Sequence, residues 1–315
     1  MSAGNHVAMG GGAEFDLIRR LLDTWGPRAS GIGDDAAVID VPHGERLVAS
    51  TDASVENVHF RREWMSPREV GARAATAALS DLAAMGARPL GLLLALALPE
   101  RWERDAEAIA DGVGVTASRV ACPIVGGNVT RGEELTLTVT VLGCATRPIT
   151  RAGAREGNII FVTGRLGGPG SALASLLAGA VPQADALARF IAPSARIDEG
   201  RWLAERGATA MIDISDGLIA DANHLANASG VSLSLDETSV PCLGGVEPNA
   251  ALVSGEEYEL LVAIPSDIAI DTAAFQQEFG IALTRIGVSV PRGNSAVLAR
   301  TSRDVAGGHD HLANR

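Results

Sequence analysis

The spacing of hydrophobic residues along the chain changes repeatedly between helical and strand-like patterns. In the first half, apolar residues recur every three to four positions over 15–22, 67–85 and 100–118, which predicts helices there. The second of these is rich in alanine, with Ser66 placed to cap its start and Gly86 to end it. Short apolar runs bounded by turn residues predict strands at 36–41, 46–50, 90–98, 123–125 and 135–142.

Two of these strands indicate how the first half is packed. Residues 90–98 are apolar throughout and lie between Pro89 and Pro99, a run about half as long as a membrane-spanning helix, which is typical of a buried strand. Residues 135–142 instead alternate between threonine and apolar residues. This alternation predicts a sheet with one packed face and one face that is polar or contacts a partner.

The second half of the chain again mixes strands and helices. It has strand patterns at 159–163, 210–214, 231–235 and 258–264, and helix patterns at 171–177, 196–206 and 218–228. Proline, glycine and charged residues gather at 147–157, where we expect a domain boundary. The chain is therefore predicted to have a flexible tail over 1–13 and two domains of the α/β or α+β class, over 14–147 and 148–315.

Composition and charge narrow the range of functions. The chain is 47% hydrophobic and 20% charged, as expected of a globular protein, and its 38 acidic and 26 basic residues give a net charge of −12. This charge argues against nucleic acid as a partner. All the basic residues are arginine, which excludes phosphate-binding, Schiff-base and general-base lysines. The three cysteines and six histidines are too scattered for a disulfide framework or a zinc site.

The sequence also argues against a membrane partner. No apolar run is long enough to span a bilayer, and the first twelve residues lack the basic and apolar regions of a secretory signal. We therefore expect a cytoplasmic enzyme or binding protein.

Acidic residues gather at the ends of the predicted strands. The clusters are Gly31-Ile32-Gly33-Asp34-Asp35, Ser50-Thr51-Asp52 and Asp213-Ile214-Ser215-Asp216-Gly217. Taken singly, such clusters are also typical of Asx turns and helix caps. Asp81 is different because it lies in an apolar helical stretch, where a carboxylate is costly to bury unless it is paired or bound to a metal. Together these four positions predict a divalent-metal site.

Magnesium is the metal that this donor set favours. Oxygen ligands, few histidines and no thiolate pairs suit magnesium better than zinc. Because magnesium uses one or two carboxylates together with phosphate oxygens, several aspartates predict several ions that hold a polyphosphate. The glycine-rich segments 125–128 and 164–170 offer main-chain N–H groups to phosphate, although the second is equally typical of an ordinary helix start.

The order and spacing of several motifs resemble one family over nearly the whole chain. The motifs are 31–35, Ser50-Thr51-Asp52 with His59-Phe60, 79–87, 126–132, 213–218 and 255–260. They resemble the thiamine-monophosphate kinases, and block 79–87 is the most specific of them. The resemblance implies the two-domain architecture shared with aminoimidazole ribonucleotide synthetase and selenophosphate synthetase, in a homodimer paired through the N-terminal sheets.

The resemblance also implies an activity, the transfer of the γ-phosphoryl group of ATP to the phosphate of thiamine monophosphate, giving thiamine diphosphate. Carried over by position, the magnesium ligands would be Asp34, Ser50, Thr51, Asp52, Asp81, Asp213 and Asp216, with Asn128 at a further ligand position. ATP would contact Gly127, Asn128, Arg151 and Ser215. The thiamine substrate would contact His59, Glu256 and His309. Without the resemblance, His59, Arg151 and Glu256 would be ordinary surface residues.

Three positions depart from the pattern of the family. Asn128 replaces a magnesium-binding carboxylate, Glu257 replaces an aspartate in the motif around Glu256, and His309 replaces an aromatic residue that packs on the substrate. The changes at Asn128 and His309 leave two alternatives open. Under the first alternative, the chain is a relative that activates a different acceptor with ATP. Under the second, it is a nucleotide-binding or metal-binding protein without turnover.

Overall fold

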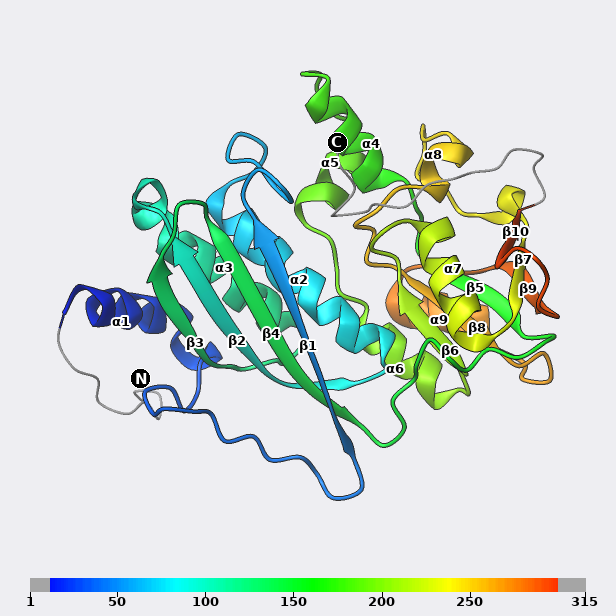
Figure 1. The fold of residues 1–315 in the computed structure, drawn as a ribbon, viewed down its shortest axis with the longest axis horizontal. Coiled ribbons are helices and arrows are strands. Elements are labelled where there is room, and N and C mark those ends of the chain that lie inside the picture. The colour runs from blue at the N-terminus through cyan, green and yellow to red at the C-terminus, as the bar shows by residue number, and fades with distance from the viewer. Residues whose placement is uncertain (1–11, 300–315) are drawn as a thin grey trace. The chain divides into compact units, whose positions relative to one another are not determined.

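A computed structural model describes residues 12–299 of the chain, which form two compact units (Figure 1). The first unit consists of the residues up to Leu82 together with Ala87–Arg147, and the second of Ala83–Gly86 together with the residues from Pro148 onward. Both units mix helices and strands, so the expected α/β (α+β) class is confirmed.

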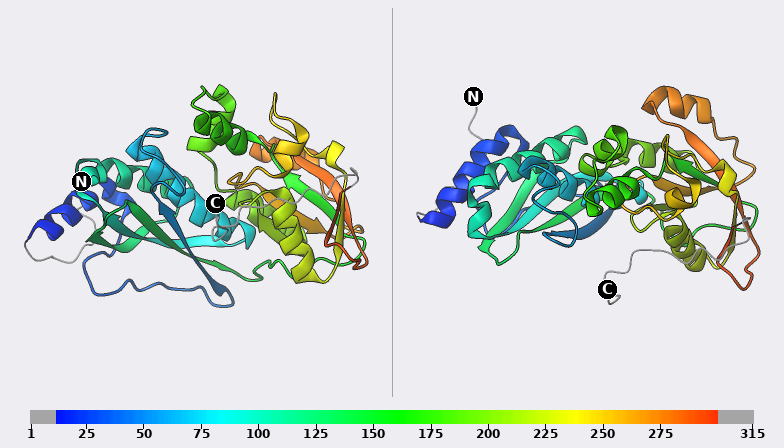
Figure 2. Two further views of the ribbon diagram at one scale, coloured as in Figure 1. Left: turned by 45° about the horizontal axis from the view of Figure 1, so that its top comes forward. Right: turned by 90° about the horizontal axis from the view of Figure 1, so that it is seen from above.

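The first unit is built on a four-stranded sheet in the order β1-β4-β2-β3. Its strands are β1 (Arg46–Val55), β2 (Arg88–Leu98), β3 (Ile124–Arg131) and β4 (Thr136–Ala145). β4 runs antiparallel to β1 and to β2, whereas β3 runs parallel to β2. The helices are α1 (Ala13–Trp25), α2 (Pro67–Ala84) and α3 (Ala106–Arg119), with 3₁₀ turns η1 (Gly26–Arg28) and η2 (Glu100–Asp105). Figures 1 and 2 show α2 and α3 against one side of this sheet, with α1 beside α3.

Side-chain alternation gives this sheet one covered face and one open face. The buried positions alternate along β2 and β4, and they are Leu92, Leu94, Leu96, Leu98, Leu137, Val139 and Val141. The residues between them, such as Leu93, Ala95, Thr138 and Thr140, are only half-buried. The packed face predicted from the threonine alternation is therefore confirmed.

The helix predicted at 67–85 is present as α2, and its start is capped as expected. The main-chain N–H of Ser66 donates to the carboxylate of Glu69 (2.7 Å), and the N–H of Glu69 donates to the Ser66 hydroxyl (3.4 Å). This reciprocal pair is a capping box. The helix packs closely on α3, because a β-carbon on Gly71 would lie 2.0 Å from the main-chain oxygen of Ile109 and one on Gly112 would lie 1.9 Å from that of Arg68.

Strand predictions in the first half are wrong at one segment and too short at two others. Residues 36–41 are irregular and not a strand, and the side chain of Val38 is 92% exposed. An apolar run forms a strand only when a neighbouring strand supplies hydrogen bonds, and within the described chain none pairs with it. The predicted strands 46–50 and 123–125 continue to Val55 and Arg131, and the helix predicted from 100 begins as the 3₁₀ turn η2.

The second unit is built on a six-stranded sheet in the order β10-β7-β9-β5-β8-β6. Its strands are β5 (Ile159–Thr163), β6 (Ala210–Asp213), β7 (Ser232–Leu235), β8 (Leu260–Ile264), β9 (Leu283–Val290) and β10 (Val297–Ala299). Its helices are α4 (Gly168–Leu177), α5 (Ala184–Ile191), α6 (Ile197–Glu205), α7 (Leu218–Ser229), α8 (Pro248–Leu252) and α9 (Thr272–Phe279), with the 3₁₀ turn η3 (Glu237–Ser239). β9, β10, α5, α8 and α9 were not predicted from the sequence.

The core of the second unit forms between the sheet and α7. Ile160 and Val162 of β5 and Leu261 of β8 are fully buried, together with Leu218 and Leu225 of α7. This packing fixes where β6 ends and α7 begins, and the loop 214–217 between them carries two of the residues expected to bind ligands. None of the helices between residues 12 and 299 is long and apolar enough to cross a membrane.

Candidate functional site

In the first unit, the end of α2 meets the middle of β1 through an acid and a hydroxyl. The Ser50 hydroxyl donates a short hydrogen bond to Oδ2 of Asp81. Asp81 is half-buried, and its neighbours Leu79, Ser80 and Leu82 are fully buried. The sequence predicted that a carboxylate in this apolar helix would need a partner or a metal, and Ser50 is such a partner. Two of the expected magnesium ligands are thus in contact.

The two residues that follow Ser50 point in different directions because side chains alternate along a strand. Asp52 is on the Ser50 side, is exposed, and accepts a hydrogen bond from the N–H of Ala53 (2.8 Å). Thr51 is on the open face, where its hydroxyl lies 3.0 Å from that of Thr140. The structure therefore separates the Thr51 hydroxyl from the Ser50–Asp81 pair. A contact from Thr51 to a metal on the Ser50 side would have to come from its main-chain oxygen.

A cavity of about 400 Å³ brings a second set of expected residues together. Its polar lining includes Asp34, Asp35 and Asn128, and its apolar lining comes mainly from α1, Leu94 and Leu96. Gly127 also lines it, and a β-carbon there would lie 2.0 Å from the main-chain oxygen of Leu94, so that only glycine fits. Asp34 thus shares one cavity with Gly127 and Asn128, from which it is far apart in sequence.

Asp52 and this cavity lie at opposite ends of one row of residues across the sheet. Asp52 is opposite Val139, Val139 is opposite Leu94, and Leu94 is opposite Gly127. At a strand spacing of about 4.8 Å, the row is roughly 14 Å long. In agreement with this separation, Asp34, Asp52 and Asp81 do not form a cluster of three possible metal ligands. Among the described residues, the ligand atoms of such a cluster would have to lie within 4.8 Å of one another.

His59 is held in a tight turn directly after β1. Its N–H donates to the carbonyl of Val55 (2.9 Å), and its Nδ1 accepts a hydrogen bond from the N–H of Val55 (3.0 Å). A nitrogen that accepts in this way carries no proton, so the imidazole is held with its proton on Nε2. The side chain is only half-buried. The turn therefore fixes the tautomer as well as the orientation of this ring.

In the second unit, the loop between β6 and α7 is built around a buried acid that the sequence analysis missed. Oδ2 of Asp221 accepts hydrogen bonds from the N–H groups of Ser215, Asp216 and Gly217, each at 3.1 Å. Burial, with the nearby charges of Asp213 and Asp216, raises the pKa of Asp221 to about 7. Asp213 is also buried, at the end of β6. The loop thus sets three carboxylates close to one another.

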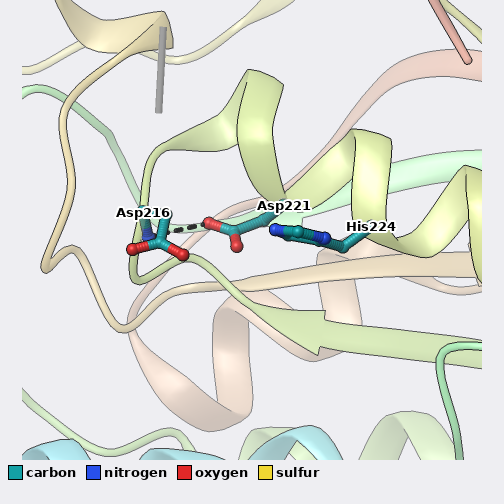
Figure 3. Close-up of side chains that lie close together, drawn as sticks. All are labelled: Asp216, Asp221 and His224. Atoms are coloured by element: carbon teal, nitrogen blue, oxygen red, sulfur yellow. Dashed lines mark hydrogen bonds between the residues drawn. The ribbon is translucent and has the colours of Figure 1, made fainter. Parts of the chain in front are cut away.

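Asp216, Asp221 and His224 form the one described group of three residues whose ligand atoms lie within 4.8 Å of one another. Figure 3 shows Asp221 between the other two, with its carboxylate directed at the main chain of Asp216. Asp221 and His224 share a face of α7 because they are three residues apart. The sequence signal that could have identified Asp221 and His224 is their spacing of three residues in the helix that follows the Asp216-Gly217 pair.

Glu256 lies in a strained turn that is fastened to the same loop. Its φ of 58° and the φ of 52° at Tyr258 are both in the left-handed region, which is costly for residues other than glycine. The N–H of Glu256 donates to the carbonyl of Ser215 (2.7 Å), and that of Tyr258 donates to the carbonyl of Ile214 (2.9 Å). The structure therefore brings Glu256, Ser215 and Asp216 together.

In the glycine-rich segment 164–170, the N–H groups of three glycines are bound to the protein itself. The N–H of Gly167 donates to Oε1 of Glu257, and that of Gly170 donates to the Ser254 hydroxyl (3.0 Å). The N–H of Gly164 donates to the carbonyl of Ala282 (2.9 Å). The helix start that the sequence left open as one interpretation is present, because α4 begins at Gly168.

The structure does not place two residues expected to contact a substrate, Arg151 and His309, beside the loop 214–217. The carbonyl of Arg151 accepts a hydrogen bond from the Ser229 hydroxyl (2.7 Å), at the last residue of α7, whereas Ser215 precedes its first turn. α7 has 12 residues and is thus about 18 Å long, so the main chains of Arg151 and Ser215 lie at its opposite ends. His309 lies outside the described residues, as does most of the predicted tail 1–13.

Glu257 makes the stability of the second unit depend on pH. Burial raises its pKa from 4.5 to about 8, although hydrogen bonds from Ser254 and Gly167 act in the opposite direction. Between these two values the folded chain holds a proton that the unfolded chain has lost. The free energy of unfolding therefore falls as pH rises from about 5 to 8, by a few kcal/mol at most from this group.

Replacing Glu257→Gln should remove this contribution, because glutamine stays neutral. Urea unfolding at a series of pH values should show the variant gaining stability relative to the unmodified protein between pH 5 and 9. Glu247→Gln, at an exposed position, serves as the control and should follow the unmodified protein throughout. Parallel pH profiles for Glu257→Gln and the unmodified protein would contradict a buried, protonated Glu257.

Comparison with known sequences places both halves of the chain in one family. Residues 33–145 match the AIR synthase related protein family, N-terminal domain, and residues 155–300 match its C-terminal domain. The thiamine-monophosphate kinase of Bacillus subtilis (strain 168) is 32% identical over 312 residues, covering 92% of this chain and 95% of the relative. That of Escherichia coli (strain K12) is 35% identical over 327 residues, covering 95% and 98%.

Comparison with solved structures gives the same result. Thiamine-monophosphate kinase from Stenotrophomonas maltophilia K279a matches with a TM-score of 0.82 and 32% identity, over 91% of this chain and 96% of that one. AaThiL complexed with AMPPCP and TMP matches with a TM-score of 0.78 and 32% identity, over 95% and 97%. E. coli HypE, a hydrogenase maturation protein, shares the fold at a TM-score of 0.75 and 22% identity, over 96% and 98%. The chain therefore belongs to the thiamine-monophosphate kinases, within the AIR synthase related proteins.

Proposed function

We propose that this chain transfers the γ-phosphoryl group of ATP to the phosphate of thiamine monophosphate, giving thiamine diphosphate and ADP. The observation that carries the proposal is the match over nearly the full length to kinases of this name, one of them solved with AMPPCP and TMP. The acceptor phosphate is already an anionic nucleophile, so the reaction needs no strong base. Positioning and charge neutralisation can supply most of the rate.

Magnesium ions are the second part of the proposal, and the donor atoms of both units fit them. Ser50 and Asp81 are in contact in one unit, and in the other Asp213 ends β6 and Asp216 lies in the loop that follows it. Such oxygen donors are those that magnesium prefers. The bound ions would offset the repulsion between the phosphates of donor and acceptor. The 26 arginines of the chain are outnumbered by 38 acidic residues, so the net charge of −12 adds to this repulsion and does not offset it.

The remaining residues are proposed to hold the two substrates. Gly127, Asn128, Arg151 and Ser215 would contact ATP, and His59, Glu256 and His309 would contact thiamine monophosphate. Three features support parts of this assignment. Gly127 lines the same cavity as Asp34 and Asn128, His59 is held as a single tautomer, and Glu256 lies in a strained turn fastened to Ser215. Strain of this kind is concentrated at functional sites.

Turnover tests the proposal directly. Purified protein with ATP, magnesium and thiamine monophosphate should yield ADP and thiamine diphosphate in equal amounts. Asp81→Asn and Asp213→Asn should each lower kcat by about 10² or more, because each removes charge at the proposed ion sites. The control Asp185→Asn, at an exposed position of α5, should leave kcat unchanged.

Two other outcomes of this assay would overturn the proposal. Turnover with a different acceptor only would favour the alternative of a relative that activates another substrate. Binding of ATP without any turnover would favour a binding protein. The departures at Asn128 and His309 are the sequence features behind these alternatives.

Asn128 offers a test of one proposed ligand. A carboxylate there would face the same cavity as Asp34 and add a negative charge, which would hold magnesium more tightly. Asn128→Asp should therefore lower the magnesium concentration for half-maximal rate several-fold, whereas the exposed control Asn249→Asp should not. An unchanged magnesium requirement would show that residue 128 is not a ligand.

We also propose that the chain forms a homodimer through the open face of the four-stranded sheet. This face carries Leu93, Ala95, Thr138 and Thr140 at its centre, and Leu47 on the edge strand β1 is 53% exposed. An apolar and threonine-rich sheet face without helices is suited to pairing with an identical face about a two-fold axis.

Thr138→Glu tests this pairing, because it places a charge at the centre of the open face. The unmodified protein should sediment with twice the mass of the 32.4 kDa chain, and the variant should sediment as a monomer. Ser118→Glu, exposed on α3 at the other side of the sheet, is the control and should remain dimeric. A monomeric unmodified protein, or a dimer that survives Thr138→Glu, would contradict the proposal.

A further inference from the structure

Glu56 is a buried carboxylate one residue beyond the end of β1, and the proposed function gives it no role. The residue is 6% exposed. Its Oε2 accepts hydrogen bonds from the guanidinium of Arg101 (2.7 Å), the indole N–H of Trp102 (3.0 Å) and the main-chain N–H of Leu135 (3.3 Å). One oxygen thus joins two segments, η2 and the residue before β4, which are between 45 and 79 residues away in sequence.

The charge of Glu56 is retained in the fold. Burial alone would raise the pKa of Glu56, but the hydrogen bonds from Leu135, Trp102 and Arg101, with the charge of Arg101, outweigh burial and hold the pKa below its usual value. Arg101 is itself held from the other side, by the carboxylate of Glu134 and the carbonyl of Glu133 (2.7 Å). Glu56 is therefore an ionised anchor between η2 and the start of β4.

The turn that presents His59 begins at this anchor. The N–H of Glu56 donates to the carbonyl of Leu135 (2.9 Å), and the N–H of Asn57, whose φ is 65°, donates to the carbonyl of Phe60 (2.8 Å). Phe60 in turn packs edge-on against Trp102, with ring centroids 6.4 Å apart. Main chain and side chains together thus fasten both ends of the turn to the residues that bind Glu56.

Trp102 explains why a hydrogen-bond acceptor is needed at this position. Its side chain is fully buried, and the donor bond to Glu56 is the one that the structure gives its indole N–H. Leaving a buried indole N–H without an acceptor is costly, so the tryptophan and the acid support each other. Phe60 follows His59 directly in the chain, and its ring contacts Trp102. A shift of Trp102 would therefore move the His59 turn.

We propose that Glu56 is a positioning residue, which holds the 55–60 turn so that His59 keeps a single orientation and tautomer toward the thiamine substrate. The carboxylate does this from behind the turn, through Trp102, Arg101 and Leu135, without touching the substrate. This inference rests on the proposed contact of His59 with thiamine monophosphate. Glu56 thereby contributes to the affinity for thiamine monophosphate and makes no contribution to the affinity for ATP.

A double-mutant cycle tests whether Glu56 acts through His59. Glu56→Gln should raise the KM for thiamine monophosphate about tenfold and leave the KM for ATP within twofold. His59→Asn removes Nε2 but keeps an acceptor near the position of Nδ1, so it should raise the same KM with the turn intact. In the His59→Asn background, Glu56→Gln should have no further effect, because residues that act as a unit are not additive. Equal effects in both backgrounds, or parallel rises in both KM values, would overturn the proposal.

Two further variants separate positioning from a loss of folding. Glu134→Gln changes the exposed partner of Arg101 and leaves Glu56 with all three donors, so it should keep both KM values. Trp102→Phe keeps a ring against Phe60 and removes one donor, so it should raise the KM for thiamine monophosphate in the same direction as Glu56→Gln, but less. If Glu56→Gln does not fold, Trp102→Phe takes its place in the cycle.

A readout in the absence of substrates distinguishes failure of this proposal from failure of the proposed function. In ¹⁵N NMR spectra of the free protein, His59 should show the Nε2–H tautomer, and Glu56→Gln should convert it to a mixture of tautomers. If His59→Asn leaves the KM for thiamine monophosphate unchanged, the substrate contact of His59 is refuted, and the spectra still decide the role of Glu56. An unchanged His59 signal in Glu56→Gln would overturn the positioning role.

Discussion

Burying a carboxylate costs free energy when this chain folds. The hydrogen-bond donors that surround each buried acid reduce that cost, and they determine where the neighbouring loops lie. Asp221 gathers three main-chain N–H groups and thereby shapes the loop 214–217. Glu257 and Ser254 bind the start of α4, and Glu56 binds Arg101, Trp102 and Leu135. In each case the loop fastened in this way carries, or adjoins, a residue proposed to bind metal, ATP or the thiamine substrate.

The same constraint links the composition of the chain to its chemistry. In a protein whose 38 acidic residues outnumber its 26 arginines, the net charge of −12 opposes the binding of two polyanions. Divalent cations resolve this conflict, because they convert surplus carboxylates into binding sites for phosphate oxygens. Under the proposed function, the acids at the ends of strands would be a requirement of the reaction, since they would bind the ions that neutralise the substrates. The chain's other acids serve the fold, as when Glu259 accepts from Arg196 through both carboxylate oxygens.

Periodicity predicted the mixed fold and most elements, because buried strands and amphipathic helices leave strong local patterns. The segment 36–41 has a strand-like pattern without being a strand, since pairing depends on a neighbour that composition does not reveal. Asp81 was singled out correctly as an acid in need of a partner, but its partner Ser50 is 31 residues away. Glu56 and Asp221 were missed because their donors come from the main chain or from distant segments. The opposite directions of Thr51 and Asp52 follow from strand alternation, which is a local property of the sequence and could have been predicted.

The central claim is that the aspartates at strand and helix ends hold divalent cations against the phosphates of both substrates. Crystals grown with Mn²⁺, a non-hydrolysable ATP analogue and thiamine monophosphate test this claim most directly, because manganese scatters anomalously. The account predicts anomalous peaks within roughly 2.2 Å of carboxylate oxygens of Asp81 and Asp213, each ion also touching a phosphate oxygen. Peaks confined to other residues, or bound substrates without any ion at these aspartates, would contradict it.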